Sequence, residues 1–369
     1  LFDVFNKENS FNFEGQATMS HLNLQNQSLN GFASEFSVEN TKGNFRYGVS
    51  HRFANETYDI NDLGLNFRNN YNNFSGRLSY QIFEPTNTFN NYRIEVFGNH
   101  QRRYKPNVTV GSGIGASSFF VTKERFAFGG FMEVNTKYRD FFEPRRENRF
   151  ITYNSNATIN AWVSSDYRKK FAYDVRFRYQ DFFNTNRNRL NLNIEPRFRF
   201  NEKFLLIYGI EFGRRDNRAS FVALQPKEVI FAKRDQKSVE NSLQANYNFD
   251  TKQALNLSFR HFWSTAEFAE EFFKLNRDGS LQPTTYTSDF NPDANFGVWN
   301  LDLSYRWRFA PGSEAILLYR NSIFNQDKLS RLDFQESLDN LFMRPARHNI
   351  SLRVVYFIDY IQIKNLFSS

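Results

Sequence analysis

The stretch WNLDLSYRWRFAPGSEAILLYRNSI, from Trp299 to Ile323, decides the fold. In its first half, apolar side chains alternate strictly with polar ones. One face would carry Trp299, Leu301, Leu303, Tyr305, Trp307 and Phe309, and the other would carry Asn300, Asp302, Ser304, Arg306 and Arg308. This period of two is typical of a strand with one apolar and one polar face. Ala310 to Ser313 then turn the chain into a second strand, so the stretch predicts a β-hairpin.

The composition suggests that the apolar face meets lipid. The chain has 369 residues, of which 45 are Phe, 18 Tyr and 4 Trp. Its mean hydropathy is nevertheless only -0.64. No apolar run approaches the roughly 18 residues that a membrane helix requires. Strands of roughly 10 residues with alternating faces can cross a bilayer in a barrel, because every backbone group is then paired.

The alternation recurs along the whole chain in 16 segments, which predict an all-β, antiparallel, up-and-down transmembrane β-barrel of about 16 strands (range 14 to 18). The segments run roughly over Phe11 to Leu24, Phe32 to Val38, Asn44 to Phe53, Asn72 to Phe83, Tyr92 to Arg102, Val108 to Val121, Arg125 to Asn135, Phe150 to Val163, Phe171 to Phe183, Leu190 to Phe200, Phe204 to Phe212, Val239 to Phe249, Leu255 to Trp263, Trp299 to Phe309, Ala315 to Ile323 and His348 to Tyr360.

The predicted connectors alternate in length, although imperfectly. Short links such as Thr41 to Gly43 alternate with longer ones such as Gly213 to Ser238 and Ser264 to Val298. Outer-membrane barrels have short periplasmic turns and long external loops. We therefore expect a Gram-negative outer-membrane location with external loops and both termini periplasmic. The absence of cysteine is compatible with an envelope protein but discriminates weakly.

Four segments carry a family resemblance: Asn61 to Tyr71, Phe142 to Arg149, Tyr305 to Arg320 and Ser351 to Tyr360. They resemble an uncharacterised outer-membrane barrel family of the Bacteroidota. In that family a periplasmic β-sandwich similar to family-nine carbohydrate-binding modules usually precedes the barrel. The resemblance implies one barrel domain over residues 1–369, with residues 1–10 as a periplasmic lead-in. It also implies that the preceding domain and the signal peptide are absent from this chain, which begins at Leu1.

The polar face of the strands would line the lumen. It is rich in both arginines and carboxylates, so two interpretations stay open. One is an anion-attracting pore, and the other, which we favour, is a ladder of cross-strand ion pairs that stiffens the wall. The candidate lumen residues are Arg176, Arg178, Arg197, Arg199, Arg306, Arg308, Asp174, Glu195 and Asp302.

Aromatic residues near strand ends suit the girdles that mark the two membrane interfaces. The candidates are Trp263, Trp299, Trp307 and Tyr360. The predicted partners are therefore outer-membrane lipids, including lipopolysaccharide, and proteins of an outer-membrane assembly. The net charge of +8 could reflect contact with anionic headgroups.

Two predicted loops contain helix-like spacing of apolar residues. Phe268, Phe272 and Leu275 would share one face of a helix from Glu267 to Leu275, and leucines from Leu329 to Leu341 show similar spacing. These segments could plug the lumen, present a ridge to a partner, or pack locally on the barrel rim, which we favour.

Catalytic, cofactor and nucleic-acid sites are poorly supported. The five histidines lack metal-ligand spacing, and His261 is expected on the lipid side. Gly111 to Gly115 (GSGIG) lies in a strand pattern without a following helix or Lys. Its glycines are expected to ease curvature or make room for a neighbour. Aromatics and arginines lie on opposite faces, which disfavours a base-stacking platform. We therefore expect no enzyme, no cofactor, no metal and no nucleic acid.

Two functional classes remain from the sequence. The first is a channel or uptake component for small polar solutes, including glycan-derived ones. The second is a non-conducting accessory subunit that anchors a periplasmic domain in a larger assembly. A soluble protein of two β-sandwiches is a distant third, because its outer faces would be coated in Phe and Tyr. An open, charged lumen or an occluded one would discriminate the first two classes.

Overall fold

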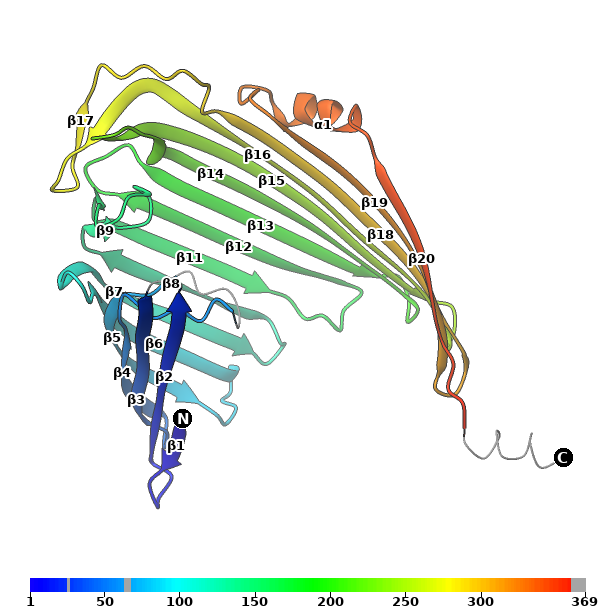
Figure 1. The fold of residues 1–369 in the computed structure, drawn as a ribbon. Helices are drawn as coiled ribbons and strands as arrows, with labels where there is room; N and C mark the ends of the chain where they lie inside the picture. The colour runs from blue at the N-terminus through cyan, green and yellow to red at the C-terminus, as the bar shows by residue number, and fades with distance from the viewer. Residues whose placement is uncertain (25–26, 63–67, 360–369) are drawn as a thin grey trace.

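The computed structural model describes residues 1–24, 27–62 and 68–359, which form an all-β protein built on one large antiparallel sheet (Figure 1). Within these residues the sheet has 18 strands, of which 16 are long and two, β1 and β17, are short. The long strands are β2 (Phe11–Leu24), β3 (Gln27–Asn40), β4 (Phe45–Ala54), β5 (Tyr71–Ile82), β6 (Phe89–Arg103), β7 (Val108–Thr122), β8 (Ala127–Asn135), β11 (Asn156–Ser164), β12 (Phe171–Phe182), β13 (Asn188–Arg199), β14 (Phe204–Leu224), β15 (Val229–Asn248), β16 (Gln253–Leu275), β18 (Ala294–Ala310), β19 (Ser313–Asp327) and β20 (Arg347–Val355).

Each predicted segment overlaps one long strand, so the up-and-down antiparallel prediction is confirmed, although Phe150 to Val163 is divided into β10 (Ile151–Tyr153) of a separate sheet and β11. Consecutive long strands pair with one another from β2 to β20. Between β8 and β11 the chain forms a separate two-stranded sheet of β9 (Tyr138–Asp140) and β10 (Ile151–Tyr153). Because one continuous sheet carries the fold, the alternative of two soluble sandwiches is wrong.

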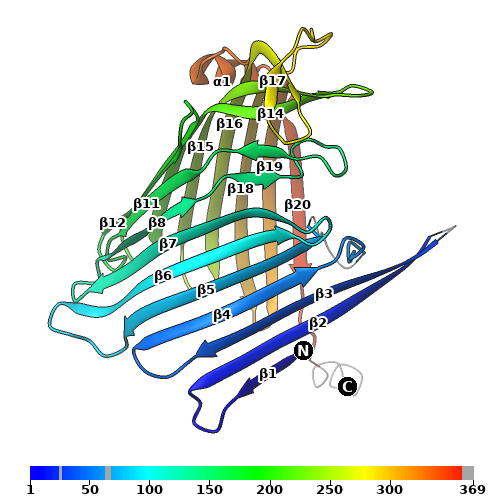
Figure 2. The same cartoon turned by 90° about the vertical axis from the view of Figure 1, so that its left-hand side faces the viewer.

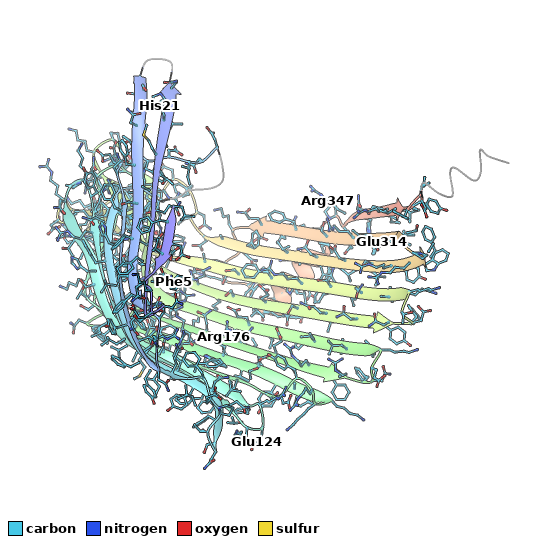
Figure 3. All side chains as sticks on the ribbon, turned by 90° about the horizontal axis from the view of Figure 1, so that it is seen from below. Phe5, His21, Glu124, Arg176, Glu314 and Arg347 are labelled. Atoms are coloured by element: carbon cyan, nitrogen blue, oxygen red, sulfur yellow. The ribbon has the colours of Figure 1, made fainter. Side chains whose placement is uncertain are left out.

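The curled sheet has two edges that lie apart (Figures 1 and 3). At one edge, β1 (Phe2–Phe5) pairs with residues 12–15 of β2 and leaves the rest of that side of β2 unpaired among the described residues. At the other edge, β20 pairs with β19, and within the described residues it shares no register with β1 or β2. The predicted closure into a barrel is therefore not found within the described chain, because the last strand and the first have no shared hydrogen-bond ladder.

The connections at the two ends of the strands differ in length, as predicted. One end has short turns such as 41–44 and 311–312, where Gly43 and Gly312 adopt φ of +81° and +70°. These left-handed conformations favour glycine. The other end carries the long connections 136–155, 276–293 and 328–346. In Figure 2, β2 to β7 cross in front of β15 to β20, with the long connections gathered toward the top.

The predicted loop from Gly213 to Ser238 is wrong, because strands β14 and β15 continue through it and turn at 225–228. The predicted helix from Glu267 to Leu275 is also wrong, since β16 extends through it beside β15. Phe272 packs against Val222 and Ile230 on one face of this extension, and Leu275 packs on the other. Both faces are buried by protein here, so the apolar residues no longer alternate.

The predicted helical segment near Leu341 is confirmed in its second half. Helix α1 (Phe334–Phe342) begins at the N-cap Asp333. The Asp333 carboxylate accepts a hydrogen bond from the Glu336 backbone amide, and the Glu336 carboxylate accepts one from the Asp333 backbone amide. Such a reciprocal cap satisfies two amides that the helix itself leaves free. The Leu341 side chain, on the face of α1 that meets the sheet, is fully buried. No described helix is both long enough and apolar enough to span a membrane.

One face of the main sheet exposes large apolar side chains along nearly its whole width. Met19 on β2, Ile114 on β7 and Ile350 on β20 are exposed by 62%, 63% and 72%. The buried apolar clusters of the described residues lie instead around the extended ends of β14 to β16. Most of the apolar surface thus lies outside any protein core.

Candidate functional site

The polar face of β11 to β14, which we call the polar wall, carries two recesses lined by charged and amide side chains. A recess of about 840 Å³ on this wall brings together five of the predicted lumen residues: Asp174, Arg176, Arg178, Glu195 and Arg197. The register explains the grouping, since Asp174 lies opposite Glu195 and Arg176 opposite Asn193 on adjacent strands. Arg176 lies on the concave side of the curled sheet (Figure 3).

Arg197 contacts two carboxylates and one aromatic ring in this recess. Its Nη2 lies 3.1 Å from Asp174 Oδ2 and 2.6 Å from Glu195 Oε1. Its guanidinium carbon lies 3.8 Å from the centre of the Tyr167 ring. The Tyr167 hydroxyl in turn donates to Asp174 Oδ1 at 2.6 Å. Tyr167 belongs to the turn between β11 and β12, and the strand alternation gave no signal for it.

The remaining predicted lumen residues lie apart from this recess. Arg199, Arg306 and Arg308 are exposed, and none has a carboxylate within 4.0 Å among the described residues. Asp302 binds Arg320 from β19, with its two oxygens 2.8 and 2.9 Å from the guanidinium nitrogens. Sequence reasoning missed Arg320 as its partner, although the two lie directly opposite in the register.

Cross-strand ion pairs recur elsewhere on the polar face, as the ladder interpretation predicted. They join Arg52 to Glu35, Arg77 to Glu39 and Arg260 to Glu240. Arg176 and Arg178, by contrast, have no carboxylate within 4.0 Å in the described chain. The wall is therefore a partial ladder that leaves an excess of positive charge.

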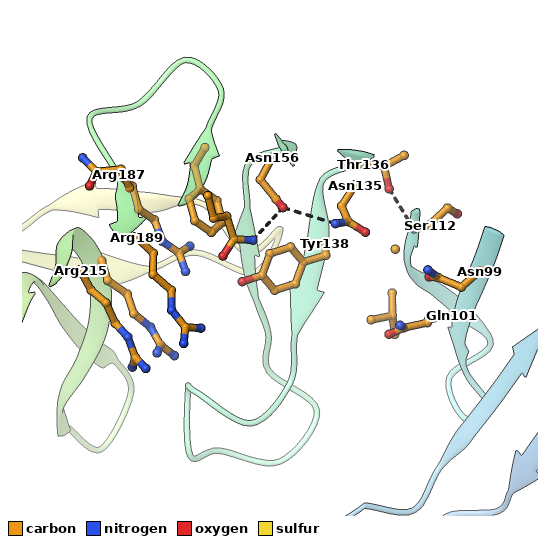
Figure 4. A pocket seen from close by; sticks show the side chains of 16 residues that line it. Asn99, Gln101, Ser112, Asn135, Thr136, Tyr138, Asn156, Arg187, Arg189 and Arg215 are labelled. Carbon is orange, nitrogen blue, oxygen red and sulfur yellow. Dashed lines mark hydrogen bonds between the residues drawn. The ribbon is translucent and has the colours of Figure 1, made fainter. Parts of the chain in front are cut away.

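A second recess, of about 350 Å³, lies at the end of the wall that faces the long connections. It shares Arg189 with the first recess, so the two form one continuous polar surface. Arg187, Arg189, Arg215 and Arg218 line one side (Figure 4). Carboxamide side chains line the other, and they belong to Asn99, Gln101, Asn135 and Asn156, while Gln180 of β12 lies between the two sides, opposite Arg189 in the register.

These arginines are held mostly by neutral groups. Arg189 Nε donates to Asn191 Oδ1 at 2.9 Å, and the Arg187 guanidinium carbon lies 3.7 Å from the centre of the buried Phe182 ring. Arg218 alone of the four has a carboxylate within 4.0 Å in the described chain, with its Nη2 2.8 Å from Glu143 Oε2. The charges of Arg189 and Arg215 repel each other.

Tyr138, of the small β9–β10 sheet, borders this recess. Tyr138 of β9 lies against Gly111 of β7, where a Cβ would come 2.9 Å from Tyr138 Cβ. The glycine-rich stretch thus makes room for a neighbour, which was one of its two predicted roles. Tyr153 of β10 donates to the Ala219 carbonyl at 2.8 Å. Burial, reinforced by the charge of Glu143, raises the pKa of Tyr153, so its hydroxyl keeps the proton for this bond.

The family is shown by a match over nearly the whole chain. A family model described as "Domain of unknown function (DUF5916)" matches residues 1–367. The chain belongs to this DUF5916 family. No curated protein matches the chain.

One similar solved structure is the FrpB iron transporter from Neisseria meningitidis (F3-3 variant). It shares 10% identity with a TM-score of 0.37, over 85% of this chain and 61% of that chain. The matched part thus covers less than two thirds of that transporter.

The predicted girdle residues of the DUF5916 chain have different surroundings. Trp307 is 45% exposed, whereas Trp263 is 5% exposed and its Nε1 donates to Asn295 Oδ1 beneath α1. Trp299 lies between Phe259 and Phe342 of α1, with ring centres 4.4 and 5.0 Å away. Tyr360 lies outside the described residues. Helix α1 therefore covers part of the apolar face of the sheet, which the alternation predicted to be exposed to lipid.

The histidines of the DUF5916 chain are dispersed. His261, expected on the lipid side, is 3% exposed and lies beneath α1 with its ring centre 5.5 Å from that of Phe334. The described residues hold no group of three His, Cys, Asp or Glu side chains placed to bind a metal ion.

Proposed function

We propose that this protein is an integral outer-membrane protein whose polar face lines a path for small polar solutes, as a channel or uptake component. One observation carries the proposal. A single sheet exposes large apolar side chains on one face, and recesses on the other face gather arginines that have no carboxylate within 4.0 Å among the described residues. Contact with lipid would explain the exposed apolar side chains of the first face, and contact with water and solute would explain the arginines of the second.

The exposed apolar face supports the membrane location. Soluble proteins rarely expose contiguous apolar patches beyond a few hundred Å², whereas here exposed apolar residues extend from Met19 on β2 to Ile350 on β20. A membrane-crossing strand needs about 9 to 11 residues, and even β8 and β20 have 9 each. We assign the short turns and both termini to the periplasm and the long connections to the outside, following the usual rule for such proteins.

The arginines that lack carboxylate partners support a role in solute passage. A wall built only for stiffness needs its charges balanced, because unpaired like charges repel. Arg176, Arg178, Arg187 and Arg215 lack a carboxylate within 4.0 Å in the described chain. Such groups attract anions and can set the charge preference of a conduit. Carboxamides beside them suit the hydroxyl groups of polar, including glycan-derived, solutes.

A second candidate is a non-conducting accessory subunit of a larger outer-membrane assembly that anchors a periplasmic domain. The two sheet edges that lack a partner among the described residues favour it, because an unpaired strand in the bilayer needs a partner for its backbone groups. Such a partner could form backbone hydrogen bonds with the outer side of β20 and with residues 16–24 of β2.

Planar-bilayer recording of the purified protein tests the proposal, with the reversal potential measured under a salt gradient. We expect stable openings with anion preference, and a reduced preference in the double variant Arg176→Gln, Arg178→Gln. Lys42→Gln, in a short turn away from the recesses, is the matched control and should leave the preference unchanged. A folded, inserted protein that never conducts would exclude the open path and favour the accessory subunit.

A further inference from the structure

We propose that the smaller recess binds a phosphorylated polyol of monosaccharide size, so that it selects the solute within the proposed path. This inference deepens the proposed function by naming the substrate class of the same polar face. It rests on the four arginines, the carboxamides beyond them and the shape of the recess between β6, β7, β8, β11, β12, β13 and β14.

The arginines supply the phosphate site. Three of the four have no carboxylate within 4.0 Å among the described residues, and Arg187 Nη1 is buried without a hydrogen-bond partner there. Arginine presents planar pairs of N–H groups that match the oxygens of a phosphate. A dianion placed among Arg187, Arg189 and Arg215 would relieve their mutual repulsion.

The opposite side of the recess supplies the polyol site. A carboxamide both donates and accepts hydrogen bonds, as a hydroxyl group does. Asn156 Oδ1 accepts from Gln180 at 2.8 Å and from Asn135 at 3.4 Å, which fixes the orientation of three of these side chains. Figure 4 shows Asn99 and Gln101 on the side of the recess away from the arginines. The ligand must therefore carry its charge at one end and its hydroxyls toward the other.

The size of the recess limits the ligand. A volume of about 350 Å³ lies near the lower end of the range for small-molecule sites, roughly 300 to 1,000 Å³. Tyr138 of β9 borders it, so the site is a defined recess rather than an open stretch of wall. A single sugar phosphate is suited to it, whereas a long glycan would have to extend into the larger recess.

Calorimetric titration of the whole protein in detergent tests the inference, with glucose 6-phosphate, glucose and inorganic phosphate as probes. We expect glucose 6-phosphate to bind at least tenfold more tightly than either of the other two. The affinity should fall at least tenfold in Arg187→Gln and in Arg215→Gln, and it should weaken with added salt. Lys42→Gln, which removes one positive charge in a short turn away from the recess, is the matched control and should bind as the original protein does.

Three results would overturn the inference. Glucose binding as tightly as its phosphate would remove the role of the arginines, and inorganic phosphate binding as tightly would leave an adventitious ion only. Unchanged affinity in the two recess variants would place the site elsewhere. Circular dichroism checks that each variant is folded, and Asn99→Ala offers a further test that leaves the charges intact. Binding without conductance would refute the proposed path alone, while conductance without binding would refute this inference alone.

Discussion

At the scale of single residues, Arg197 shows how the polar wall is held. Its guanidinium contacts two carboxylates and the face of Tyr167, and its side chain is only 21% exposed. An ion pair on a fully exposed surface contributes little, because water and salt screen it. A partly buried group with three partners contributes more, since removing it leaves two carboxylates close together.

We expect Arg197→Gln to lower the free energy of unfolding by about 1 to 2 kcal/mol, because Asp174 and Glu195 then lose their shared cation. Urea titration in lipid vesicles would measure the change. Arg168→Gln is the matched control, since the Arg168 side chain is 61% exposed beside Asp166, and it should lower the free energy of unfolding much less than Arg197→Gln does. Equal losses in the two variants would contradict the role assigned to Arg197.

Residue identity alone could predict only part of this site. Asp174, Arg178 and Glu195 follow from strict alternation, because residues two apart in a strand share a face. Arg187 and Tyr167 lie in connections, and Tyr138 lies in a three-residue strand. These residues reach the recesses through loop conformations, for which the period of two gives no signal.

At the scale of elements, glycines set how closely some strands and side chains approach. A Cβ on Gly130 of β8 would lie 2.0 Å from the Asn160 carbonyl oxygen of β11, whereas one on Gly98 of β6 would lie 3.6 Å from its nearest neighbour. A backbone oxygen in a paired strand cannot move aside without disturbing the ladder. Close pairing of β8 with β11 therefore depends on the missing side chain.

We expect Gly130→Ala to destabilise the sheet by about 1 to 3 kcal/mol, the range for an inserted methyl group that forces backbone shifts. Gly98→Ala is the control and should be nearly neutral. Thermal unfolding followed by circular dichroism would compare the two variants in the same lipid. If both melt with the original protein, β8 and β11 do not approach as closely as described.

Helix α1 supplies a second test at this scale. Leu341 is fully buried and lies against Gly297 of β18, whereas Leu329, before the helix, is 53% exposed. We expect Leu341→Ala to cost about 2 kcal/mol by leaving a cavity, and to increase amide hydrogen exchange within Phe334–Phe342. Leu329→Ala should leave that exchange unchanged. An unaltered α1 in the first variant would show that the helix does not depend on this contact.

The elements were predictable wherever one face of a strand is apolar and the other polar. The expected and observed bounds of β2 coincide at Phe11 and Leu24. Beyond Gly213 the same argument fails, because Val222 packs on one face of the extended hairpin and Phe231 packs on the other. Two protein-covered faces remove the alternation that a membrane imposes, and the segment then resembles a loop.

At the scale of the whole molecule, the two sheet edges are the surfaces that still need a partner. β20 has one paired side in the described chain, and its apolar residues Ile350 and Leu352 are 72% and 66% exposed. An unpaired backbone group costs several kcal/mol in hydrocarbon. If the protein resides in a bilayer, these edges must pair with each other or with another protein.

We therefore expect the amides of β20 that lack a partner on β19 to be protected from hydrogen exchange in the native membrane. In a detergent that separates partners, the same amides should exchange at least tenfold faster. The amides of β12, which is paired on both sides, should remain protected in both settings. Fast exchange of β20 in the native membrane would contradict its placement within the bilayer.

Pairing between successive strands also bears on how such a chain can change over generations. Nearly every strand of the main sheet finds its partners directly before and after it in sequence. Gain or loss of one whole hairpin would therefore preserve the direction and the outward face of all the others. Related chains could therefore differ in sheet width by steps of two strands, and each step would leave the register of the remaining hairpins unchanged.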